Sequence, residues 1–120
     1  MANLLSAQDI DIVHRATRID RTMVTAILRR ESSELRAKLI AASHIAIALG
    51  RDEELRDPYE DDPQWANAVS DAKSAASAEI NFEGRGRCHA IWERQAAILW
   101  QTYQIRWYSP AQMNPWIMFD

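Results

Sequence analysis

The chain has 120 residues, of which 48% are apolar and 26% are charged, and its formal net charge is −3. This balance is that of a globular protein with one real core, and it excludes wholesale disorder. The charge is uneven, because residues 1–50 carry seven basic and five acidic side chains, whereas residues 51–63 carry two and seven. We therefore interpret residues 51–63 as an acidic, solvated linker.

Cysteine usage and hydropathy indicate where the protein resides. The one cysteine, Cys88, cannot form an internal disulfide, which fits a reducing compartment. Charge appears after only eight residues, too early for the apolar part of a signal peptide. No apolar run approaches the roughly 20 residues that span a bilayer. We expect a cytoplasmic protein with no membrane partner.

Capping residues mark two helices in the first half of the chain. Ser6 is a suitable N-cap for a helix that ends near Arg18. Asp20 is a suitable N-cap for a second helix, which Gly50 terminates. Leu28, Leu35 and Leu39 share one phase, and this favours a single helix over residues 20–49. A break would fall at Ser32-Ser33.

Two further helices follow the acidic linker. Asp62 as N-cap and Pro63 at the first helical position predict a third helix that extends to Ile80. A fourth helix is predicted from Arg87 to Tyr108, with its apolar residues on one broad arc. Nothing alternates at a period of two for long enough to predict a strand. The sequence predicts one all-α domain over residues 1–108, a four-helix antiparallel bundle or a bent helical array.

Residues 107–120, WYSPAQMNPWIMFD, are rich in aromatic and other large apolar side chains. Pro110 and Pro115 oppose a helix there, so residues 109–120 are predicted to form an extended aromatic tail. Such a tail needs a surface to lie on: its own bundle, a second copy or a different protein. We expect a non-enzymatic structural or interaction subunit, an assembly, accessory or connector-type protein that docks on its own copies or on a larger complex. The expected anchors are Trp107, Tyr108, Trp116, Ile117 and Phe119.

Arginines gather at two turns of the predicted fold. One group spaces its members three apart between the first two helices, and the other flanks two glycines ahead of the fourth helix. These side chains are candidates for a charged rim or for an anion site. They are Arg15, Arg18, Arg21, Arg85 and Arg87. The glycine-rich segment at residues 84–89 can equally be interpreted as a plain turn between helices.

Residues 9–30 resemble a helix-turn-helix reader of nucleic acid, with a short helix, a turn and a second helix that starts with threonines. The resemblance implies a second helix in the major groove and arginines on phosphates. Three observations oppose it: the turn lacks the usual glycine, the second helix is predicted to be long, and the pI is about 5.6. Nucleic-acid binding is therefore the alternative function.

A small helical enzyme or metal-binding bundle is the second alternative. Asp11 and His14 share a helix face, but a carboxylate-bridged metal site needs such pairs from two helices. Cys88 and His89 are neighbours that point in different directions, so they do not form a nucleophile and base. No phosphate-binding or nucleophile motif occurs. We expect no catalytic residue, metal or cofactor.

Overall fold

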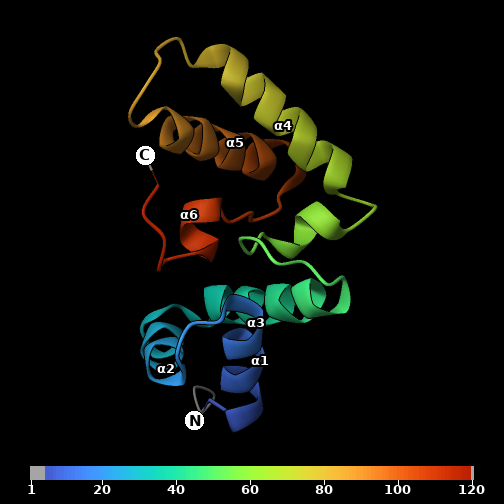
Figure 1. Ribbon diagram of the computed structural model, residues 1–120. Coiled ribbons are helices and arrows are strands. Elements are labelled where there is room, and N and C mark those ends of the chain that lie inside the picture. Colours follow the sequence, from blue (N-terminus) through green and yellow to red (C-terminus); the bar gives the residue numbers. More distant parts are fainter. Residues whose placement is uncertain (1–4, 120) are drawn as a thin grey trace. The chain divides into compact units, whose positions relative to one another are not determined.

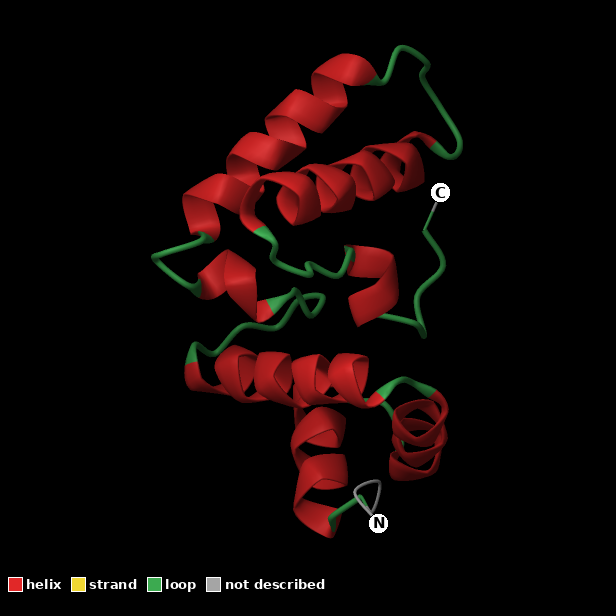
Figure 2. Cartoon of the chain, turned by 180° about the vertical axis from the view of Figure 1, so that it is seen from behind, coloured by secondary structure: helices red, strands yellow, loops and turns green. Residues whose placement is uncertain are grey.

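The computed structural model describes residues 5–119, and every regular element in that range is helical (Figures 1 and 2). The elements are α1 Ala7–Thr17, α2 Arg21–Arg30, α3 Ser33–Ala48, η1 Pro58–Asp61, α4 Ala66–Glu79, α5 Arg87–Tyr103 and α6 Pro110–Met113. The all-α prediction is confirmed, whereas the antiparallel four-helix arrangement is not. Within the described range no helix has the length and apolar character needed to cross a membrane.

The chain divides into two compact units, unit 1 up to Pro58 and unit 2 from Tyr59 onward. The boundary lies inside the segment that the sequence marks as an acidic linker. The single domain over residues 1–108 stays a prediction.

The predicted caps of unit 1 are confirmed. The Ser6 hydroxyl accepts a hydrogen bond from the Asp9 backbone N–H at 3.0 Å and starts α1. The Asp20 carboxylate accepts from the Thr22 N–H at 2.8 Å and starts α2. Gly50 follows α3 with a φ of 64°. Each side-chain cap satisfies a backbone group that the helix itself leaves unpaired.

The prediction of one continuous helix over residues 20–49 is wrong. α2 ends at Arg30, and Glu31 is extended. The Ser32 hydroxyl then accepts from the Leu35 N–H at 3.1 Å and starts α3. A serine side chain that accepts a hydrogen bond from a nearby backbone N–H competes with continuation of the helix. The common phase of the leucines gives no information on this competition. The Arg36 side chain closes the break by donating to the Leu28 carbonyl at 2.7 Å.

The core of unit 1 is aliphatic. α1 packs against both α2 and α3. Their three axes point in clearly different directions, since α1 runs across α3 while α2 is seen nearly end-on (Figures 1 and 2). The apolar side chains buried in this unit are Val13, Val24, Ile27, Leu28, Leu35, Leu39, Ala42, Ala46 and Leu55.

The interpretation of residues 51–63 as a solvated linker is wrong in part. Leu55 is buried, and Asp57 is 0% exposed. Lys38 of α3 donates to both carboxylate oxygens of Asp57 at 2.9 and 3.0 Å. A cation from a distant part of the chain therefore compensates the burial of one acidic residue, and sequence composition cannot indicate that pairing.

Unit 2 is built on the contact between α4 and α5. α4 begins at Ala66 and not at Pro63, because residues 63–65 form a turn on which Asp62 accepts the Gln64 N–H at 2.9 Å. Small residues of α4, Ala72 and Ala76, are buried and let α5 approach closely.

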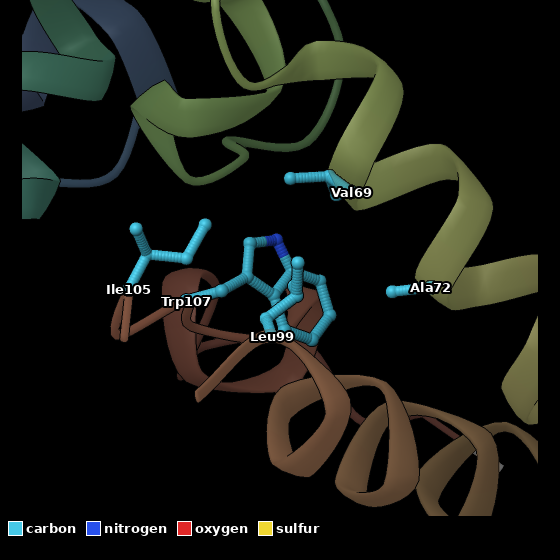
Figure 3. Close-up of a cluster of buried hydrophobic side chains, with 5 residues drawn as sticks. All are labelled: Val69, Ala72, Leu99, Ile105 and Trp107. Atoms are coloured by element: carbon cyan, nitrogen blue, oxygen red, sulfur yellow. The ribbon is translucent and has the colours of Figure 1, made fainter. Parts of the chain in front are cut away.

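The prediction that the fourth helix extends to Tyr108 is also wrong, since α5 ends at Tyr103. Gln104 takes the left-handed conformation, with a φ of 60°, and turns the chain back. Trp107 consequently enters a core cluster with Val69, Ala72, Leu99 and Ile105, which we name the Trp107 cluster. Figure 3 shows its indole directed toward α4 beside Leu99. The indole N–H donates to Glu60 at 3.0 Å.

The predicted extended tail contains a short helix. Ser109 and Gln112 form a capping box at α6. Pro110 occupies the first turn, where the backbone N–H that proline lacks would have no partner within the helix. Further on, the Phe119 ring meets Trp92 of α5 edge-to-face, with centroids 5.4 Å apart. The His89 ring donates to the Phe119 carbonyl at 2.9 Å. The tail thus packs on unit 2 itself.

Candidate functional site

The five expected docking anchors differ in accessibility. Trp107 is 4% exposed and lies in the Trp107 cluster, so it presents little surface to a partner. Tyr108, Trp116 and Phe119 are half-buried, and Ile117 is exposed. Of the anchor set, Ile117 retains the accessible apolar surface that docking requires.

Other apolar side chains of unit 2 are more exposed than the anchors. Met118 is 94% exposed, Trp100 is 46% exposed and Tyr103 is 41% exposed. The sequence places Trp100 and Tyr103 on the apolar arc of the fourth helix, and we therefore expected them inside. α5 therefore does not bury its whole apolar arc, whereas Trp107, which lies beyond the end of this helix, is buried in the core.

An apolar groove of about 310 Å³ lies beside Trp100. The Arg106 guanidinium stands over the Trp100 ring at 5.4 Å from its centroid, a cation–π geometry. The residues that line this groove, named here the Trp100 groove, are Ala96, Ala97, Trp100, Ile105, Arg106 and Trp107.

Of the two arginines at the candidate anion site, residues 84–89, one is engaged in contacts within the protein. Arg87 donates toward the Ser77 and Ile80 carbonyls at 3.4 Å each and lies 3.6 Å from Glu83. It therefore ties the α4–α5 connection to the end of α4. Arg85 is exposed. An anion at this turn stays a prediction.

The first two helices of unit 1 are short and are joined by a brief turn. α1 has 11 residues and α2 has 10, and the three residues Arg18, Ile19 and Asp20 join them. The Arg18 N–H donates to the His14 carbonyl at 2.7 Å, and the His14 ring donates to the Ile19 carbonyl at 2.6 Å. These two hydrogen bonds tie the turn to the last part of α1.

Two of the observations that opposed a helix-turn-helix are thereby removed. Arg18 adopts a φ of 64°, the left-handed conformation for which such turns usually need glycine. α2 ends at Arg30 because Ser32 starts a new helix, so it is short. The sequence gives no signal for the left-handed arginine, and it favours a continuous helix although it marks Ser32-Ser33 as the place where a break would fall.

One face of α2 is open to solvent. Thr22, Met23 and Ala26 are exposed there, while Val24, Ile27 and Leu28 point into the core. Arg29 and Arg30 follow in the last turn. α2 contains three arginines and no acidic residue. The exposed face therefore combines small apolar groups with positive charge at both ends.

Each arginine expected at this turn has an aspartate partner. Arg21 donates to Asp11 of α1 at 2.5 Å, and Arg15 lies 4.0 Å from the same carboxylate. Arg18 lies 3.3 Å from Asp52. The Arg21 hydrogen bond, with the charges of Arg21, Arg15 and His14, holds the pKa of Asp11 below its usual range. Exposed pairs of this kind are weak and exchangeable.

No cluster of three or more histidine, cysteine, aspartate or glutamate side chains suited to a metal ion occurs in residues 5–119. His14 of the predicted Asp11–His14 pair instead serves the turn. No family model, no curated protein and no solved structure matches the chain. Its function is therefore inferred from the geometry of the two units.

Proposed function

We propose that unit 1 binds duplex DNA through α1, the turn at residues 18–20 and α2. The observation that carries this proposal is the left-handed Arg18 turn between two short helices, which leaves one face of α2 open. In this arrangement the second helix enters the major groove and the first crosses the backbone.

The dimensions and side chains of α2 suit that role. Its 10 residues extend about 15 Å, and a B-form major groove about 12 Å wide admits one helix. Thr22, Met23 and Ala26 would face base edges, where methyl groups contact thymine. Arg29 and Arg30 at one end of α2, and Arg18 and Arg21 at the other, would contact phosphates, which fix position without reading sequence. The deep, narrow major groove of duplex RNA does not admit such a helix.

Charge distribution supports the same surface. The acidic pI of the whole chain reflects the linker and unit 2, since residues 59–120 carry five basic and eight acidic side chains. Unit 1, residues 1–58, carries nine basic and nine acidic side chains in total, but residues 7–30, which span α1 and α2, carry five basic and three acidic ones. The local field at α1 and α2 is therefore positive, and a local field governs association with a polyanion.

The test is fluorescence anisotropy with a labelled DNA duplex of two helical turns, measured over a series of salt concentrations. The variant is Arg18→Gly with Arg21→Ala, in which glycine removes the charge and suits the positive φ. We expect the Kd to rise roughly tenfold for each arginine–phosphate hydrogen bond that the variant removes. The slope of log K against log salt should become shallower by about 0.9 for each phosphate that is no longer neutralised.

The matched control removes two basic side chains from unit 2 that lie outside every candidate site, Lys73→Ala with Arg94→Ala, and leaves binding and its salt slope unchanged apart from a small general charge effect. If this control weakens binding as much as the unit 1 variant does, contact through α1 and α2 is refuted. Absence of any salt-dependent binding by the full chain refutes the function itself.

A second candidate function, self-association through unit 2, is favoured by a specific observation. The Trp100 groove is apolar, and Met118 on the same unit is almost fully exposed. An apolar groove and an apolar side chain on one unit are complementary halves of a contact between two copies of this chain. This form retains the expected interaction subunit and its anchor Ile117, and it adds Trp100, Tyr103 and Met118 as anchors in place of Trp107.

Solution mass by light scattering tests self-association. The full chain should form a concentration-dependent dimer or larger oligomer, and either Trp100→Glu or Met118→Glu should return it to a monomer. Phe82→Glu is the matched control, because Phe82 is equally exposed at 45% but does not line the groove. A chain that is monomeric at every concentration contradicts the candidate.

A further inference from the structure

A hollow of about 560 Å³ lies where the three helices of unit 1 meet. α1 contributes Gln8, Asp11, Ile12 and Arg15, whose spacing of three and four residues places them on one helix face. α2 contributes Arg21, and α3 contributes His44. We name this the Asp11 hollow.

Asp11 stands between the two arginines of the hollow. Its carboxylate accepts from Arg21 and faces Arg15 at 4.0 Å. Two guanidinium groups that converge on one anionic group are the arrangement that binds a phosphate oxygen pair in many proteins. The Asp11 carboxylate therefore occupies the position that a bound phosphate would take between these side chains.

We propose that the Asp11 hollow receives a backbone phosphate of the bound duplex, and that Asp11 is a built-in competitor for Arg15 and Arg21. This inference rests on the proposed function, because it assigns one phosphate contact of that same surface. Binding requires the arginines to exchange a carboxylate for a phosphate, with Gln8 and His44 as further hydrogen-bond donors at the edge.

Exposure makes the exchange feasible. The Arg21 and Arg15 side chains are 61% and 57% exposed, and Asp11 is 39% exposed. Water screens such pairs, so little free energy holds the arginines on Asp11. A phosphate brings a full charge and several acceptor oxygens to the same donors. The aspartate consequently lowers affinity for the duplex without abolishing it.

The test compares Asp11→Asn with Asp9→Asn, using the same labelled duplex and salt series. Both variants remove one negative charge from α1, but Asp9 lies in the first turn of that helix and does not line the hollow. We expect Asp11→Asn to lower the Kd roughly three- to tenfold and to steepen the salt slope by about 0.9. Asp9→Asn should produce clearly less of both effects.

The other outcomes are equally decisive. If Asp11→Asn weakens binding, Asp11 positions Arg21 for contact and the competitor role is overturned. If Asp11→Asn and Asp9→Asn change binding equally, the effect comes from the net charge of α1 alone, and the competitor role of Asp11 is again overturned. In both cases the full chain still binds DNA in a manner sensitive to Arg18→Gly with Arg21→Ala, so the proposed function survives. If neither the full chain nor Asp11→Asn binds the duplex, both proposals fail.

A calorimetric titration with inorganic phosphate separates the two sources of the ligand. We expect no saturable heat at millimolar phosphate for the full chain or for Asp11→Asn, because a single phosphate lacks the neighbouring contacts of a duplex. Saturable binding of inorganic phosphate that the duplex fails to displace would assign the hollow to a free anion and overturn the backbone assignment.

Discussion

The two units differ sharply in the side chains that build them. Unit 1 contains no aromatic residue, whereas all ten aromatic side chains of the protein fall in residues 59–120. Unit 1 orders its chain in three capped helices around an aliphatic core. Unit 2 has two long helices, and the chain beyond α5 has one short helix of four residues.

This contrast explains what the aromatic residues contribute. A chain with little regular structure makes few backbone hydrogen bonds of its own, so its ordering entropy must be offset by buried area. Each aromatic side chain can bury about 150–250 Å². Trp107 and Phe119 bring such area to the last part of unit 2. The aromatic residues of this segment therefore stabilise the fold of unit 2. The large apolar side chains that stay exposed in the segment are Ile117 and Met118.

The strongest test of this contrast replaces the buried tryptophan. Trp107→Ala should lower the free energy of unfolding of unit 2 by about 3–5 kcal/mol, through a cavity and a missing hydrogen bond. Trp100→Ala, the same change at an exposed position, should cost less than about 1 kcal/mol. Urea unfolding followed by tryptophan fluorescence measures it, because all five tryptophans lie in unit 2. If Trp107→Ala does not fold, the milder variant Trp107→Phe is measured in its place. Equal losses of unfolding free energy at positions 107 and 100 would contradict the difference in burial.

A smaller effect is expected in unit 1. Asp57→Asn should destabilise it by about 1.5–3 kcal/mol, because the hydrogen bonds that Lys38 donates to this buried carboxylate become weaker when the acceptor is a neutral amide. The matched change Asp52→Asn removes an exposed pair with Arg18 and should cost less than about 0.5 kcal/mol. Circular dichroism during urea unfolding reports the helices. If both variants lose similar amounts of free energy of unfolding, the Asp57–Lys38 pair contributes no more than an exposed pair, and residues 51–63 behave as the solvated linker that the sequence predicts.

The smallest effect concerns pH. Because Arg21 lowers the pKa of Asp11 in the folded state, the pair stabilises the fold above the unfolded pKa of about 4. That contribution disappears as the pH falls through the lowered folded value. Carboxyl NMR titration should show the Asp11 pKa return toward its ordinary value in Arg21→Ala. In the control Arg94→Ala, which disrupts a pair with Glu79 in unit 2, the Asp11 titration should be unchanged.

Local signals predicted the parts of the fold that depend on near neighbours. Ser6 and Asp20 cap helices where the sequence indicated, and Gly50 follows the end of α3. The candidate site was half predicted: the arginines at the first turn were identified, but the left-handed Arg18 and the end of α2 were not. An arginine in that conformation costs free energy that the surrounding contacts offset, and no residue pattern announces it.

Local sequence was sufficient to predict an all-α protein and the residues that cap its first two helices. Long-range packing decided that Trp107 is buried while Trp100 is exposed, that Asp57 pairs with Lys38, and that Arg21 of α2 reaches Asp11 of α1. The reason is range. Caps and helix propensity act within about one turn, whereas burial and charge pairing depend on which distant segment arrives, and the free energy of that arrival is shared over many contacts.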